Sequence, residues 1–69
     1  MSRKDNKFYK ALEANCHSEI QNGKAIVETY FENSVGVGDH SSFMEDIKKG
    51  MEMINRAEET LVNLKKHFE

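Results

Sequence analysis

The stretch FMEDIKKGMEMINRAEETLVNLKKHF, residues 43–68, decides the fold. Its hydrophobic residues recur every three or four positions, so they gather on one side of a helical wheel, and most charged residues fall on the opposite side. This periodicity predicts an amphipathic helix, which we place at residues 42–68. Its hydrophobic side holds Phe43, Met44, Ile47, Met51, Ile54, Ala57, Leu61, Val62, Leu64 and Phe68.

The N-terminal half has the same pattern and predicts a second helix over residues 5–33, after a polar tail, residues 1–4, that we expect to fray. Gly23 weakens this helix, but the phase of the hydrophobic side continues across it, so we predict one unbroken helix. That side holds Phe8, Tyr9, Leu12, Cys16, Ile20, Ile26, Val27, Tyr30 and Phe31.

The glycine-rich stretch SVGVGDHSS, residues 34–42, lies between the two predicted helices. Gly36 or Gly38 can adopt the left-handed conformation that ends a helix, and the polar residues that follow can cap the next one. Phosphate-binding loops have a lysine and a glycine spacing that this stretch lacks. We therefore predict a plain turn over residues 34–41, which makes the chain an all-α, two-helix antiparallel hairpin.

The size and charge of the chain exclude several classes of protein. Its 69 residues and 8.0 kDa allow one domain, and its single cysteine allows no internal disulfide, which favours a cytoplasmic location. No apolar stretch is long enough to cross a membrane. The net charge is −2 with both signs interspersed, so we expect no nucleic-acid binding. Such binding would need Arg3, Lys4, Lys7 and Lys10 to group on one edge.

Both hydrophobic sides are wider than a single hairpin can cover. The second helix has a hydrophobic sector of about 160°, against about 100° for a helix that packs on one side only. A lone hairpin would expose this surface, so we predict self-association as a coiled-coil-like, dimeric four-helix bundle. Half of a complex with a different protein is the alternative. The predicted interface residues are Phe8, Leu12, Ile20, Val27, Met44, Ile47, Met51, Ile54, Leu61 and Phe68.

Few residues suggest chemistry. Neighbours on a helix point about 100° apart, so Cys16 and His17 do not converge on one ion. Glu13 and His17 share a face, but two ligands are too few for a structural metal site. No nucleophile and base stand at catalytic spacing. We therefore expect no catalytic residues, no metal and no cofactor.

Three charged residues fall inside or at the edge of the hydrophobic sectors: Glu19, Glu58 and Lys65. They can pair in the bundle core and fix how the hairpins dock. They can form an internal carboxylate site for a ligand or reaction. They can also extend from the sector edge into water. The sequence leaves these three interpretations open.

Folding the chain about residue 37 brings Gly23 and Gly50 to nearly the same level. Two glycines at one level allow two helices to approach closely. Alternatively, both are only tolerated weak points in their helices.

Residues Tyr30–Leu61 resemble small uncharacterised proteins of marine cyanobacterial tailed phages. The distinctive part is the V-G-x-G-[DE]-H bend, here Val35–His40. Those proteins often have proline after the histidine, where this chain has Ser41. The resemblance implies a helical hairpin of phage origin and transfers no functional residues.

The sequence thus favours a non-enzymatic, self-associating protein–protein interaction module, with an unidentified protein partner as a further expectation. The alternative is a small bundle enzyme or ligand carrier with Glu19 and Glu58 in an internal site.

Overall fold

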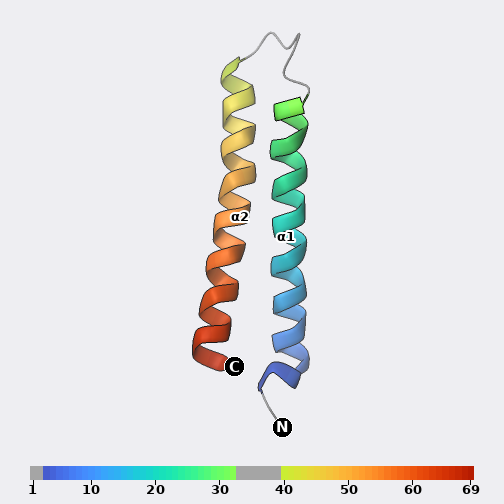
Figure 1. Ribbon diagram of the computed structural model, residues 1–69, viewed down its shortest axis with the longest axis vertical. Coiled ribbons are helices and arrows are strands. Elements are labelled where there is room, and N and C mark those ends of the chain that lie inside the picture. Colours follow the sequence, from blue (N-terminus) through green and yellow to red (C-terminus); the bar gives the residue numbers. More distant parts are fainter. Residues whose placement is uncertain (1–2, 33–39) are drawn as a thin grey trace.

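Two long helices lie side by side and antiparallel in the computed structural model, with both termini at the same end (Figure 1). The structure describes residues 3–32 and 40–69. Helix α1 spans Lys7–Glu32 and helix α2 spans His40–Phe68, and a short 3-10 helix, η1, covers Arg3–Asp5. The molecule measures 54 × 15 × 13 Å. The predicted all-α helical hairpin is confirmed.

Helix α1 begins two residues later than the sequence predicts. The side-chain Oδ1 of Asn6 accepts hydrogen bonds from the backbone N–H groups of Phe8 (2.8 Å) and Tyr9 (3.4 Å). This is the position and bonding of a helix N-cap. Residues 3–5, most of which we expected in a frayed tail, form the turn of η1, and the Asn6 N–H donates to the Arg3 carbonyl at 2.9 Å.

Helix α2 begins at His40, two residues earlier than predicted. Ser42, where we placed the start of this helix, is therefore its third residue. The rest of the predicted turn, and most of the Val35–His40 bend, lie outside the described residues.

A regular spacing of seven residues marks the seam where the two helices meet. Seven residues are two turns of a coiled-coil helix, so such residues follow one line along its surface. We call these two lines the seam. On α1 the seam holds Tyr9, Cys16, Gly23 and Tyr30, and on α2 it holds Phe43, Gly50, Ala57 and Leu64.

Small residues occupy the middle of the seam. A Cβ atom added to Gly23 would lie 2.6 Å from the Gly50 carbonyl oxygen and 2.7 Å from Ile54 Cγ1. One added to Gly50 would lie 2.8 Å from Val27 Cγ2. These distances are shorter than real Cβ contacts, so only glycine fits at both positions without movement of a neighbour. The close-approach interpretation of the two glycines is confirmed.

Larger residues close both ends of the seam. At the turn end, the rings of Tyr30 and Phe43 meet edge to face, with centroids 4.6 Å apart. At the terminal end, Tyr9 is buried and its hydroxyl donates to the Glu69 carboxylate at 3.5 Å. The Arg3 guanidinium lies 6.0 Å from the centre of the Phe68 ring, within cation–π range. These contacts attach η1 and the C-terminus to the hairpin.

The hydrophobic core is thin. Among the described residues, the buried hydrophobic side chains are Tyr9, Cys16, Val27 and Ala57, and no large side chain is completely buried. A narrow seam of small residues covers little apolar surface, and burial of such surface is the main force that stabilises a fold. Much of the apolar surface of the helices therefore lies outside the seam.

Candidate interaction surface

The seam divides the hairpin into two sides of different chemistry. In an antiparallel pair, residues four positions after a seam residue point to the same side on both helices, and residues three positions after it point to the other side. Two contacts fix the assignment. Lys65 Nζ lies 3.9 Å from Glu13 Oε2 on the first side, and Tyr30 bonds to Asp46 on the second.

The first side is apolar toward the turn end. Phe31, Met44 and Met51 follow seam residues by one position and lie at its outer edges, where they are 69%, 53% and 42% exposed. Half-buried isoleucines lie between them and the seam. We call this surface the Met–Ile face; it consists of Ile20, Phe31, Met44, Ile47, Met51 and Ile54. It draws on both helices, as a surface for packing against a second helix pair would.

The predicted interface residues divide into three groups. Val27 is buried by its own chain, in contact with the opposite helix at Gly50. Four residues are half-buried: Ile20, Ile47, Ile54 and Leu61. Five are exposed: Phe8, Leu12, Met44, Met51 and Phe68. Their role as an interface between copies stays a prediction.

The three charged candidates are not brought together. Glu19 is half-buried three positions after Cys16, whereas Glu58 is exposed one position after Ala57, on the other side of the seam. Lys65 is exposed and approaches Glu13 rather than Glu58. Among the described residues, no charged side chain is buried. The single chain therefore holds Glu58 and Lys65 in water, and their burial between copies stays a prediction.

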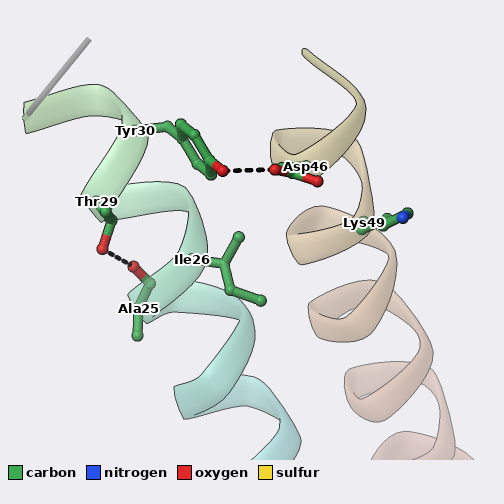
Figure 2. Close-up of a pocket in the computed structure, with 6 residues that line it drawn as sticks. All are labelled: Ala25, Ile26, Thr29, Tyr30, Asp46 and Lys49. Atoms are coloured by element: carbon green, nitrogen blue, oxygen red, sulfur yellow. Dashed lines mark hydrogen bonds between the residues drawn. The ribbon is translucent and has the colours of Figure 1, made fainter. Parts of the chain in front are cut away.

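The second side has a shallow groove near the turn end, with a volume of about 440 Å³. Figure 2 shows Tyr30 extending from α1 toward Asp46 on α2, where its hydroxyl donates to the carboxylate at 2.5 Å. This hydrogen bond, then burial and the negative charge of Asp46, raises the pKa of the Tyr30 phenol. The lining residues are Ala25, Ile26, Thr29, Tyr30, Asp46 and Lys49.

The two hydroxyl groups of this groove already donate hydrogen bonds within the protein. Thr29 donates to the backbone carbonyl of Ala25 at 2.7 Å, and Tyr30 donates to Asp46. The Lys49 side chain points away from Tyr30 (Figure 2). A catalytic site needs a base within reach of a nucleophile and a free position for the substrate. The Tyr30–Asp46 hydrogen bond in this groove links the two helices. The groove therefore lacks both a base within reach of a nucleophile and a free position for a substrate.

A second groove, of about 490 Å³, lies at the terminal end, on the same side of the seam as Leu12. Its lining includes Tyr9, Leu64, Arg3 and Phe68, and the Arg3 guanidinium lies near the Phe68 ring. Phe8, at 84% exposure, forms an outer wall. Arg3 lies near an aromatic ring, and the absence of nucleic-acid binding stays a prediction.

Cys16 and His17 lie in different surroundings, one buried and the other exposed. Burial, and the nearby charge of Glu19, raises the pKa of the Cys16 thiol, which disfavours the reactive thiolate. His17 is exposed on the outer surface of α1. Within residues 3–32 and 40–69, no three His, Cys, Asp or Glu side chains group as a metal ion would require.

The sequence did not single out Phe31 or Asp46. Phe31 belongs to the hydrophobic side of the first helix, and its position one residue after Tyr30 places it at the edge of the Met–Ile face. The seven-residue spacing of the seam is the signal that would have identified both residues.

Comparisons with protein-family models, with curated proteins and with solved structures find no match for this chain. The resemblance to phage proteins therefore stays a prediction. In the part of the chain that the structure describes, neither helix has a stretch apolar and long enough to cross a membrane.

Proposed function

We propose that the chain is a non-enzymatic helical interaction module that self-associates into a dimeric four-helix bundle. The observation that carries this proposal is the contrast between a thin core and a large exposed apolar surface. Among the residues that the structure describes, seven large hydrophobic side chains are exposed: Phe8, Leu12, Phe31, Met44, Met51, Val62 and Phe68. Soluble monomers rarely expose large apolar patches, and small chains without disulfides often gain stability from a partner.

A second copy is the partner that best fits this observation. A chain whose own core is this thin needs its partner whenever it folds, and another copy is always present where the chain is made. Two-fold dimers are also the commonest oligomers. The phage resemblance adds a host or assembly protein as a further partner of the outer, charged surfaces.

The alternative function, an enzyme or ligand carrier with an internal carboxylate site, gains no support from the positions of Glu19 and Glu58. These two side chains lie on opposite sides of the seam, and a reaction or ligand site needs them to converge.

Light scattering of the purified full-length chain tests the proposal. At micromolar concentration we expect a mass of twice 8.0 kDa. A mass of one chain over the whole concentration range would overturn the proposal. A larger fixed mass would contradict the two-fold dimer and leave self-association supported.

A further inference from the structure

The first side of the hairpin, which contains the Met–Ile face, changes character along its length. Toward the turn end, its outer positions hold Phe31, Met44 and Met51, and also Lys24. Toward the terminal end, the equivalent outer positions, one residue after each seam residue, hold Lys10, His17, Glu58 and Lys65. Apart from Lys24, this side is therefore apolar in one half and charged in the other.

We propose that a second copy covers this face with its two-fold axis parallel to the helices, so that the two turn ends lie together. This inference depends on the proposed self-association. It adds which face of the hairpin associates and how the two copies are oriented. In this arrangement each α2 lies over α1 of the other copy. The apolar halves of the two copies then cover each other, which removes Phe31, Met44 and Met51 from water.

The opposite arrangement, with the axis perpendicular to the helices, is less favourable at full overlap. It would place the apolar half of each copy on the charged half of the other. Met44 and Phe31 would then lie near the lysines of the terminal end. Charged groups that lose water without a partner oppose association.

The parallel axis also sets which residues of the charged half face each other. Gly23 and Gly50 lie at one level of the hairpin. His17 is six residues before Gly23 and Glu58 is eight residues after Gly50, so their levels differ by about 3 Å along the axis. Where α2 of one copy lies over α1 of the other, Glu58 therefore faces His17 of the second copy, and by the same count Lys65 faces Lys10. Lys65 keeps its partner Glu13 within its own chain.

The second side of the hairpin is a poorer dimer surface near the turn. It presents Asp46, Lys49 and Thr29, and its tyrosine hydroxyl is already paired. Its exposed apolar residues, Phe8 and Leu12, lie at the terminal end only. Near the turn, the apolar residues Ile26 and Met53, which the structure describes on this side, are half-buried.

A matched pair of substitutions tests the surface. Met51→Glu places a charge in the Met–Ile face, whereas Val62→Glu places the same charge on an exposed apolar residue of α2 outside this face. By sedimentation equilibrium we expect Met51→Glu to weaken dimerisation at least about tenfold and Val62→Glu to leave it unchanged. Circular dichroism at high concentration reports whether each variant still forms helix.

The outcomes separate the two proposals. If the native chain is monomeric, the proposed function and this inference both fail. If the native chain and Met51→Glu dimerise equally well, self-association stands and the Met–Ile face is overturned. Loss of dimerisation in both variants also overturns the assignment to this face.

Spin labels test the direction of the axis. Glu45→Cys and Lys66→Cys occupy the same outer position near the two ends of α2, and each is labelled in a Cys16→Ala chain. A parallel axis predicts one similar label-to-label separation at both sites, within about 30 Å, because helices in a bundle pack 8–10 Å apart. A Lys66 separation that approaches the 54 Å length of the hairpin would overturn the parallel axis.

Discussion

At the scale of single residues, Gly23 and Gly50 set the distance between the helices. Glycine inside a helix ordinarily lowers stability by about 1 kcal/mol relative to alanine. Here each glycine lacks the side chain that would collide with the opposite helix, and the collision at Gly23 involves the Gly50 backbone oxygen, which cannot turn aside. The local penalty is therefore offset by close packing.

Gly23→Ala should reduce stability although alanine favours helix. The added methyl group forces the helices apart, and overpacking of this kind costs about 1–3 kcal/mol. After the gain in helix propensity, we expect the free energy of unfolding to fall by about 1 kcal/mol or more. Urea unfolding at one fixed chain concentration measures this.

The exposed neighbour Asn22 provides the control. Asn22→Ala should raise the free energy of unfolding by a few tenths of a kcal/mol, because only helix propensity changes. If Gly23→Ala stabilises the chain as much as Asn22→Ala does, the close approach of the helices is wrong.

The hydrogen bond from Tyr30 to Asp46 makes stability depend on alkaline pH. The bond, burial and the Asp46 charge raise the phenol pKa above its ordinary value of 10.0. A raised pKa in the folded state means that its contribution is fully present below pH 10.0 and is lost as pH rises through the folded-state pKa. The pKa values of Tyr9 and Cys16 are also raised in the folded state, so their contributions to stability are likewise lost in alkali. For Cys16 this loss begins lower, because the ordinary pKa of its thiol is 9.0.

Tyr30→Phe should lower stability at neutral pH and reduce the further loss in alkali. Urea unfolding compared between about pH 8 and about pH 11 measures both effects. Tyr9→Phe is the matched control, because its 3.5 Å bond to Glu69 is longer. An alkaline loss as large in Tyr30→Phe as in the native chain would contradict the assigned role of this bond.

At the scale of helices, the start of α1 depends on one side chain. Asn6 accepts two backbone N–H groups that would otherwise lack a partner within the helix. Asn6→Ala should lower the free energy of unfolding by about 1 kcal/mol, whereas Asn6→Asp should keep most of it. Asp5→Ala is the control from the preceding turn. Equal losses in Asn6→Ala and Asp5→Ala, measured by thermal unfolding, would contradict the capping role.

The periodicity of hydrophobic residues was enough to predict both helices and their antiparallel packing. It could not locate the ends of the helices, because several polar residues near each end can cap equally well by type. Asp5 and Asn6 are both good caps, and only the backbone geometry selects Asn6.

The predicted hydrophobic sectors were too wide to show which residues form the seam. The wheel gave equal weight to every apolar residue, so Val62 was grouped with Leu61 although Val62 is 63% exposed. Small residues such as Cys16, Gly23 and Ala57 carry little hydrophobic signal, yet they form the actual contact. Their seven-residue spacing is a better guide to the contact than hydrophobicity alone.

At the scale of the whole molecule, the small residues in the seam leave the larger ones outside it. The helices meet through glycine, alanine and cysteine, so methionine, isoleucine and phenylalanine flank the contact and stay in part exposed. The sequence predicted that one copy would expose apolar surface. It could not predict the side of the hairpin involved, because that depends on which residues form the seam.

The central claim is that one copy of this chain has more apolar helix surface than it can cover, so that folding depends on a second copy. Thermal unfolding followed by circular dichroism over a hundredfold range of chain concentration tests it most directly. For a folded dimer, the midpoint should rise by roughly 4 °C for each tenfold increase in concentration. A midpoint that stays the same over the whole range would contradict the claim.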